Sequence, residues 1–415
     1  MIEEDRLVHP DILQEALHLL KDHFASDIKI NSIKFLSEAD RRNVLLRITL
    51  TSPSSTVPKS IILKQSLPEP SDSDDKDAYA RFSRDWAGLK FISGIEKNVH
   101  NVPKFYGGSK QQRFILIEDL GHKHISLVDS LTLPNESKAI EALERFMKAL
   151  GSFHGESFGI TNRYEQILKK INPQLETLQE NLDFCFNDLL PTLELANQNL
   201  GLSISASLIN EARHIIQSVH LPGPFTVLTH GDICPDNVFD HEDNLDLQLI
   251  DFEWGSVRNA LLDATYLRMS MPTCWCAKAI PTPIIEPLEL IYRNELKQLI
   301  PAASDDLAYS TAYTEACGFW VLQQTLHFLN STLEIDRVGP SGPTPDHSLW
   351  KPEDNWVRPR VLSRLQAFVD VATKHNQFPN LRLMSATMLE KLSRLWPDLN
   401  PLEFYPAFQV TEDKY

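Results

Sequence analysis

Strand-like runs lie almost entirely in the first 120 residues of this chain, and this distribution limits the folds available to it. Apolar and β-branched residues form runs at 43–50 and 60–66, and the stretch 101–121 has the pattern of a turn with two strands. A single later interruption of this kind, at 228–256, stands among segments with other spacing. The chain therefore cannot be an all-β protein or a regular alternation of strands and helices.

Helical spacing fills the rest of the chain. Apolar residues recur at helical intervals in 9–24, where Pro10 and Asp11 are typical start signals, and again in 78–95. After residue 120 helical segments dominate. We therefore expect an α+β chain of two lobes: a small strand-rich N-lobe over 1–120 and a large, mainly helical C-lobe over 121–415.

Composition excludes several classes of partner. The 415 residues are 42% hydrophobic and 23% charged, which is ordinary for a globular protein, and the formal net charge is −16. Such a charge is unsuited to phosphate backbones, so we expect no nucleic-acid partner. No apolar run approaches the ~18 residues of a membrane span, and the acidic N-terminus lacks a signal pattern. We expect a cytoplasmic protein with no membrane partner.

The cysteines predict free thiols. Their odd number and wide spacing do not fit a disulfide framework, and no second Cys or His pair stands at metal-ligand spacing from Cys274 and Cys276. The five are Cys185, Cys234, Cys274, Cys276 and Cys317.

Five residues stand in the order that phosphoryl transfer from a nucleotide requires. Lys64 lies mid-strand in "IILKQ", and Asp85 follows on the next helical segment. Asp232 and Asn237 are five residues apart in "HGDICPDN", and Asp251 follows the run "LDLQLI". In the protein-kinase template a catalytic Asp precedes a metal-binding Asn by five residues, and a second metal-binding Asp comes in a later loop.

These segments resemble the aminoglycoside phosphotransferase and choline kinase-like superfamily. "HGDICPDN" followed by "LIDFE" is similar to its signature, in which a Gly replaces the Arg of the protein-kinase catalytic loop. "FSRDWAGLKFI", "VPKFYGG", "FILIEDLG" and "ALGSFHGES" resemble other parts of the same pattern, in the same order. The resemblance covers residues from about 60 to about 270.

The resemblance implies a bilobal, protein-kinase-like fold that binds ATP or GTP with Mg²⁺. It implies that Asp232 is the catalytic base and that Asn237 and Asp251 are magnesium ligands. Lys64 would contact the phosphates, and Asp85 would pair with Lys64. The purine would lie against the backbone of the segment Glu118, Asp119 and Leu120.

Two departures from the family pattern bear on the nucleotide. The stretch "SEADRRNVLLRI", where the family usually has glycines, contains none, so Asn43 and Arg42 are expected to substitute by side-chain contacts. Asp85 replaces the usual Glu and is one methylene shorter, which predicts a closer approach of its helix to Lys64. "Asp-Phe-Glu" in place of Asp-Phe-Gly argues against a regulated activation loop.

Other polar residues near the motif have alternative roles. His230 is expected to brace the catalytic loop rather than act as a base or ligand. Asp263 could contact substrate, but a bond to the backbone near that loop is favoured. Glu253 could support a second metal, face the acceptor, or bond the neighbouring backbone. Asp236 and Asp240 are expected to be turn and solvent residues.

The acceptor is the least constrained part of the prediction. Nine acids and one base lie between His230 and Asp263, most of them expected to be solvated, and this excess favours a neutral or cationic acceptor. A stripe on a late helix could line the acceptor pocket, although core packing is the default for such stripes. Its members are Trp320, Gln323, Gln324 and His327.

The sequence thus predicts an ATP-dependent small-molecule kinase with a hydroxyl acceptor. A catalytically silent nucleotide-binding or scaffolding protein on the same fold is the alternative suggested by the missing glycines, although Asp232, Asn237 and Asp251 are all present. A protein kinase is a second alternative, which the lack of activation-loop signals opposes.

Overall fold

The structure is a computed structural model that describes residues 8–37, 41–69, 75–95, 101–175, 177–241, 246–338 and 355–409. Its contacts divide the chain into two compact units. The N-terminal unit comprises Met1–His124 together with two later segments, Asn162–Leu175 and Ile250–Trp254. The remainder forms the C-terminal unit. Residues 38–40 of the glycine-free stretch lie outside the described residues.

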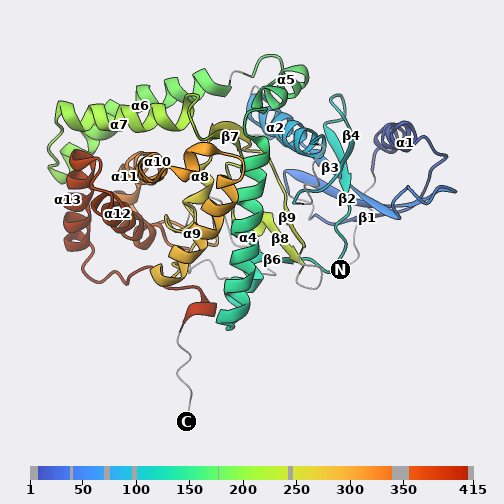
Figure 1. The fold of residues 1–415 in the computed structure, drawn as a ribbon. Coiled ribbons are helices and arrows are strands. Elements are labelled where there is room, and N and C mark those ends of the chain that lie inside the picture. Colours follow the sequence, from blue (N-terminus) through green and yellow to red (C-terminus); the bar gives the residue numbers. More distant parts are fainter. Residues whose placement is uncertain are drawn as a thin grey trace, which may run out of the picture. The chain divides into compact units, whose positions relative to one another are not determined.

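An antiparallel five-stranded sheet forms the N-terminal unit, with strand order β1-β2-β3-β5-β4 (Figure 1). Its strands are β1 (Lys29–Phe35), β2 (Asn43–Thr51), β3 (Ser60–Ser66), β4 (Phe105–Ser109) and β5 (Phe114–Glu118). The predicted runs are confirmed as β2, β3, β4 and β5. β1 was not predicted, because this edge strand has no fully buried residue and so lacks a clear apolar alternation.

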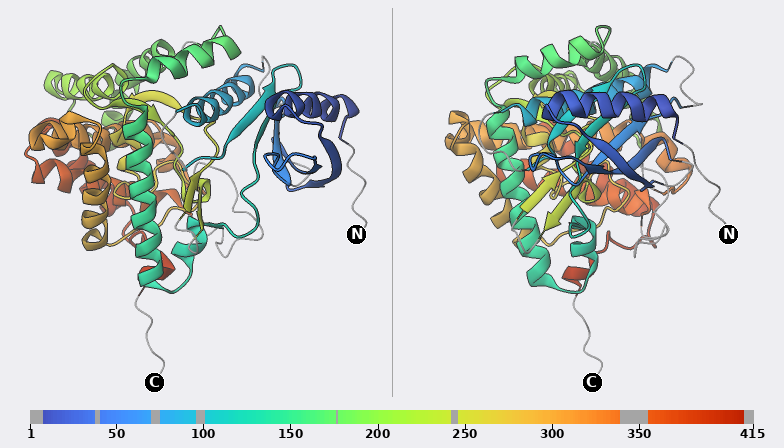
Figure 2. Two further views of the ribbon diagram at one scale, coloured as in Figure 1. Left: turned by 45° about the vertical axis from the view of Figure 1, so that its right-hand side comes forward. Right: turned by 90° about the vertical axis from the view of Figure 1, so that its right-hand side faces the viewer.

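Three helices accompany this sheet: α1 (Pro10–Phe24), α2 (Lys76–Ser93) and α5 (Thr161–Ile171). The two predicted N-terminal helices are confirmed as α1 and α2. α1 begins at Pro10 and lies across the strands (Figure 2), with Ile12 and Leu20 in the same buried cluster as Ile48 and Leu63. This packing of an amphipathic helix on alternating strand residues holds β3, and with it Lys64, in place.

Helices make up most of the C-terminal unit, so the predicted α+β class, strand-rich first and then mainly helical, is confirmed. They are α3 (Leu127–Thr132), α4 (Glu136–Ser157), α6 (Thr177–Leu200), α7 (Ala206–His220), α8 (Leu261–Ala264), α9 (Thr282–Lys297), α10 (Asp306–Val321), α11 (Leu329–Glu334), α12 (Val357–Lys374) and α13 (Pro379–Leu395). Short helical turns are η1 (Pro235–Asn237), η3 (Pro301–Ser304), the π-helical turn η4 (Leu322–Leu326) and η6 (Pro406–Phe408). Among the described residues, no helix is both long and apolar enough to cross a membrane.

Two small antiparallel sheets carry the motif of the C-terminal unit, one of order β6-β8-β9 and one joining β10 to β7. Their strands are β6 (Ile125–Ser126), β7 (Thr226–Thr229), β8 (Val238–His241), β9 (Asp246–Leu249) and β10 (Ser256–Asn259). The long helix α4 packs beside α9 (Figure 1), where a Cβ on Gly151 would lie 2.7 Å from the Glu295 side chain. This close approach brings His154 of α4 to Tyr292 of α9.

Candidate active site

Lys64 is the centre of a buried charged cluster in the N-terminal unit. Its side chain leaves β3 on the face opposite Leu63 and is almost fully buried, with 7% of the residue exposed. Nζ lies 2.7 Å from Oδ1 of Asp251 and 2.8 Å from Oδ2 of Asp85. Burial alone would lower the pKa of Lys64, but Asp251, Asp85 and Glu253 together raise that pKa well above its usual value. The ammonium group is therefore held charged.

Asp85 also fixes the backbone of the segment that carries Asp251. Its Oδ1 accepts a 2.9 Å hydrogen bond from the Phe252 N–H. Phe252 is fully buried, and a Cβ on Gly88 would lie 2.9 Å from its side chain, so only glycine leaves room at that point of α2. Asp251 has a φ of 69°, an unfavourable conformation for a residue with a side chain. Residues of α2 thus hold Asp251 beside Lys64.

Glu253 joins this segment to the start of β2. Only 3% of Glu253 is exposed; Oε2 accepts from Arg42 at 2.7 Å, and Oε1 accepts from the Asn43 amide at 2.6 Å. Oε1 also lies 3.4 Å from Nζ of Lys64. Of the roles considered for Glu253, a bond to the neighbouring backbone does not occur among its hydrogen bonds in the described part of the chain. It is a side-chain anchor for the two residues expected to replace the glycines.

The segment after β5 presents main-chain groups as well as a fixed carboxylate. Asp119 accepts from Arg47 at 2.9 Å and from the Ser60 hydroxyl at 2.6 Å; burial alone would raise its pKa, but these bonds lower it. The Glu118 N–H is used by Lys104, and the Leu120 carbonyl lies 2.7 Å from the His124 ring. Within the described residues, the Asp119 carbonyl and the Leu120 N–H make no hydrogen bond. The Asp119 carbonyl can therefore accept a hydrogen bond from a ligand, and the Leu120 N–H can donate one.

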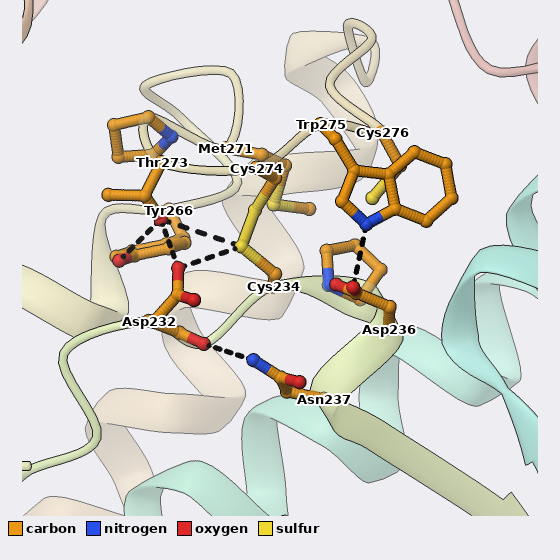
Figure 3. Close-up of a disulfide and its surroundings, with 12 residues drawn as sticks. Asp232, Cys234, Asp236, Asn237, Tyr266, Met271, Thr273, Cys274, Trp275 and Cys276 are labelled. Carbon is orange, nitrogen blue, oxygen red and sulfur yellow. Dashed lines mark hydrogen bonds between the residues drawn. A yellow bond between two sulfur atoms is a disulfide. The ribbon is translucent and has the colours of Figure 1, made fainter. Parts of the chain in front are cut away.

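Asp232 and Asn237 come together in the C-terminal unit, in the turn between β7 and β8. Asn237, the last residue of η1, donates from its amide Nδ2 to the Asp232 carbonyl at 2.9 Å (Figure 3). Its Oδ1 has no hydrogen-bond partner in the described ranges. The five-residue spacing therefore serves a local purpose, because the Asn237 amide closes the turn.

The buried carboxylate of Asp263 holds this turn in place by hydrogen bonds to its main chain. Asp263 of α8 is 1% exposed and accepts from the main-chain N–H groups of His230 at 2.6 Å and Gly231 at 3.2 Å. His154 Nε2 lies 3.1 Å from Asp263, and Nδ1 lies 2.7 Å from the Tyr292 hydroxyl. Burial alone would raise the pKa of Asp263, but His154 and its other neighbours lower it. Asp263 bonds the backbone here, and no contact with substrate is needed to explain its burial.

Thr273 contacts the Asp232 side chain, although nothing in its sequence context singled it out. Its hydroxyl lies 2.5 Å from Oδ1 of Asp232, and the Tyr266 hydroxyl lies 3.1 Å from the Thr273 hydroxyl (Figure 3). A Ser or Thr forty residues from a motif carries no periodic or spacing signal. Only the fold brings it to this carboxylate.

The prediction of free thiols is wrong for two cysteines. Cys234 and Cys274 form a disulfide (Figure 3), while Cys276 and Cys317 are free and buried. Sγ of Cys234 lies 3.1 Å from Oδ1 of Asp232 and, being disulfide-bonded, has no proton to donate. The pairing could not be inferred from spacing, because the partners are 40 residues apart and meet only in the folded chain.

The expected solvent role of Asp240 is also wrong, whereas Asp236 lies in the turn η1, as expected, and is partly buried. Asp240 is fully buried and receives two bonds from Arg145 of α4, at 2.9 and 2.5 Å. Asp236 accepts from the indole N–H of Trp275 at 2.7 Å. Both carboxylates are bonded by residues distant in sequence, and Arg145 balances the charge of Asp240.

The late-helix stripe is divided between core and surface. Trp320 is 2% exposed and donates to the Leu262 carbonyl at 3.2 Å and to Thr265 at 3.1 Å, which is the core role taken as the default. Gln323 and His327 border a small cavity of about 40 Å³ against α6, and the Gln324 carbonyl accepts from Arg364. The stripe therefore does not line one large pocket.

Residues 44–275 match the model of the Ecdysteroid kinase-like family, which is more than half of the chain. Comparison with curated proteins found no similar sequence.

Solved structures of kinases resemble the chain over most of its length, with low sequence identity. A choline kinase from Cryptosporidium parvum is 10% identical, with 93% of this chain and 96% of that chain covered and a TM-score of 0.42. An ethanolamine kinase from Plasmodium vivax is 13% identical, with 86% and 85% covered and a TM-score of 0.40. An amicoumacin kinase in complex with AMP-PNP and Ca²⁺ is 13% identical, with 91% and 97% covered and a TM-score of 0.42.

Proposed function

The chain belongs to the ecdysteroid kinase-like family, a family of small-molecule kinase-like proteins, and we propose that it transfers the γ-phosphate of ATP to a hydroxyl group of a small molecule. The observation that carries the proposal is the buried Lys64, whose ammonium group lies within 2.8 Å of both Asp85 and Asp251. An isolated structural lysine does not require two acids, one of them in a strained conformation. A lysine that must meet nucleotide phosphates does need such alignment.

The reaction exchanges one oxygen on the γ-phosphorus for another and moves one proton. The acceptor oxygen attacks the γ-phosphorus, the bond from that phosphorus to the β,γ-bridging oxygen breaks, and ADP leaves. Asp232 takes the proton of the acceptor hydroxyl as the new O–P bond forms. Lys64 stabilises the negative charge of the phosphate oxygens, and Asp85 holds Lys64 in position.

Magnesium fits the oxygen donors present. Asn237 uses its amide nitrogen internally and keeps Oδ1 for a cation, and Asp251 contributes a carboxylate whose side chain is 30% exposed. Amide and carboxylate oxygens are ligands that Mg²⁺ prefers, usually together with phosphate oxygens. The ion would supply charge neutralisation at the transferred phosphate.

The donor nucleotide is proposed to be ATP, with GTP as the alternative. The Asp119 carbonyl and the Leu120 N–H are the main-chain groups that support purine binding after β5. Arg42 and Asn43, anchored by Glu253, are proposed to replace the backbone contacts of a glycine-rich loop. Arg42 is suited to this because 47% of its side chain is exposed and a guanidinium binds phosphate oxygens well.

A neutral alcohol is the acceptor that we propose. The acids near the catalytic turn favoured a neutral or cationic compound, but Asp240, Asp251 and Glu253 are paired with Arg or Lys, which weakens the argument for a cation. The description of the family names ecdysteroids, which are neutral steroid alcohols, and these are the first compounds to test.

Two measurements test the function. Thermal melts with magnesium-ATP or magnesium-GTP should show stabilisation, by about 2.7 kcal/mol at a hundredfold excess over the dissociation constant. ADP release should then be followed with ecdysteroids, amino alcohols and aminoglycosides as acceptors. A protein that binds nucleotide but never turns over with any alcohol would favour the silent nucleotide-binding alternative. Melts unmoved by every magnesium-nucleotide would refute the kinase assignment.

A further inference from the structure

The loop 270–276, which follows α8, delivers a hydroxyl group to the side chain assigned as the base. Oγ1 of Thr273 lies 2.5 Å from Oδ1 of Asp232 (Figure 3). An ionised carboxylate can only accept, so Thr273 must be the donor in this bond. Its single proton is then committed to Asp232.

Tyr266 lies against both Thr273 and the catalytic turn. Its hydroxyl lies 3.1 Å from Oγ1 of Thr273 and 3.0 Å from the Gly231 carbonyl. The single proton of the Tyr266 hydroxyl points to the Gly231 carbonyl, which can only accept, so Tyr266 contacts Thr273 without donating to it. Burial, together with the nearby Asp232 and Asp263, raises the pKa of Tyr266 well above its usual value, so Tyr266 keeps its proton and donates it to the Gly231 carbonyl.

The backbone around Thr273 is held by a buried guanidinium. Arg360 of α12 is 2% exposed and donates to the carbonyls of Met271 at 2.9 Å and Pro272 at 3.4 Å. Burial lowers the pKa of Arg360 to about 10, yet the group still carries its charge at neutral pH. Burying a charged group costs free energy. A buried guanidinium that bonds two carbonyls therefore indicates that the position of this backbone is important.

The loop 270–276 also contains two residues with unfavourable backbone conformations and one end of a disulfide. Ser270 and Met271 have φ values of 56° and 48°, a region that residues with side chains rarely adopt. Consecutive strained residues persist only where the surroundings over-determine them, and they cluster near functional groups. On the other side of Thr273, the Cys234–Cys274 disulfide joins the loop to the catalytic turn.

We propose that Thr273 is a positioning residue that sets the plane of the Asp232 carboxylate for proton acceptance. Holding Oδ1 fixes the direction in which the group can take a proton from the acceptor hydroxyl. Tyr266, Arg360 and the Cys234–Cys274 disulfide keep Thr273 in place. The inference rests on the proposed function only in naming Asp232 as the base.

The test compares Thr273→Val, which removes the hydroxyl at nearly constant volume, with Thr273→Ser, which keeps it. Turnover of magnesium-ATP is measured with the best acceptor found, or with water as acceptor if none is found. The Val variant should lose kcat by about 10- to 100-fold with an unchanged KM for ATP. The Ser variant should recover most of the rate. Thr387→Val on α13, whose hydroxyl bonds only the Leu383 carbonyl among the described residues, is the matched control and should leave kcat unchanged.

A crystal structure of the Thr273→Val protein supplies a readout that needs no activity. The Asp232 carboxylate should rotate away from its wild-type orientation while the main chain stays in place. An unmoved carboxylate, or a kcat equal to that of the wild type, would overturn the inference. So would an equal loss in the Val and Ser variants accompanied by a lower melting temperature. If wild type and Asp232→Asn turned over ATP equally slowly, the proposed function would fail, and the crystal structure would still decide whether Thr273 holds Asp232.

Discussion

Asn43 donates a 2.6 Å hydrogen bond to the Glu253 carboxylate, although 210 residues separate the two in the chain. Arg42, next to Asn43, reaches the other oxygen of the same carboxylate at 2.7 Å. The start of β2 lacks glycine, so we propose that side chains there make the phosphate contacts that the backbone of a glycine-rich loop makes in other kinases. Glu253 holds both of these side chains from within the buried Lys64 cluster.

The first prediction concerns Glu253→Gln. The amide can keep one hydrogen bond but leaves the buried Lys64 and the half-exposed Arg42 with less compensating charge. We expect the free energy of unfolding to fall by about 1–3 kcal/mol and the KM for ATP to rise. Urea unfolding and steady-state kinetics measure these effects.

Glu286→Gln is the matched control, because 49% of the Glu286 side chain and 65% of the side chain of its partner Lys374 are exposed. That change should cost less than about 1 kcal/mol and leave KM unaltered. Equal effects of the two substitutions would show that Glu253 is an ordinary surface partner.

Asp232→Asn and Asp251→Asn should fail in different ways. The Asp232 amide can still bind nucleotide but cannot take a proton, so turnover should drop by about 10²- to 10⁴-fold. The Asp251 amide loses its charge beside Lys64 and its metal-binding capacity, so magnesium-dependent nucleotide binding should weaken as well. Calorimetric titration of both variants at matched magnesium, alongside kinetics, separates the two. Wild-type turnover in Asp232→Asn would refute its role, and unchanged affinity in Asp251→Asn would remove it as a ligand.

A third prediction links Asp263 to acid stability. The pKa of Asp263 is lowered in the folded protein from its usual value of 3.8, so its contribution to stability is present above that value and is lost as pH falls through the folded pKa. Asp263→Asn should cost about 1–3 kcal/mol near neutral pH, because two main-chain N–H groups lose a charged acceptor.

Unfolding free energies between about pH 6 and pH 2 test this, since the gap between wild type and variant should narrow as the pH falls. Asp306→Asn, at a side chain that is 91% exposed, should show a small and constant difference. A gap for Asp263→Asn that stayed constant down to the acid limit would contradict the assigned pKa shift.

The fourth prediction concerns the disulfide. A dithiol reductant such as dithiothreitol should convert the Cys234–Cys274 bond to two thiols, free the loop 270–276 and lower kcat by roughly threefold to tenfold, a part of the Thr273→Val effect. In the Cys234→Ser, Cys274→Ser double variant the rate should no longer respond to the reductant. Thiol titration of the denatured protein before and after reduction verifies the bond. A rate insensitive to reduction, with the bond shown to break, would rule out a role for the disulfide in holding Thr273.

Local patterns in the sequence determined a large part of the fold. The alternation in 43–50 and 60–66 and the helical spacing after Pro10 specify elements through neighbours a few residues apart, so they could be read directly. The spacing of Asp232 and Asn237 is local too, because the Asn237 amide closes its own turn. β1 escaped prediction because an edge strand with polar neighbours has no strong alternation.

Only the tertiary structure decided which charges and hydroxyl groups meet. Asp240 lies in a hydrophilic stretch but is buried, because α4 brings Arg145 to it from 95 residues away. Packing between elements brings Glu253 to Asn43 and Thr273 to Asp232. The sequence pattern of an element specifies which of its faces is buried, but not which polar residue of another element lies opposite. The sequence by itself therefore determined the family, most of the elements of the N-terminal unit and the order of the candidate site residues. The partners that orient those residues depend on contacts between distant segments, which exist only after the chain has folded.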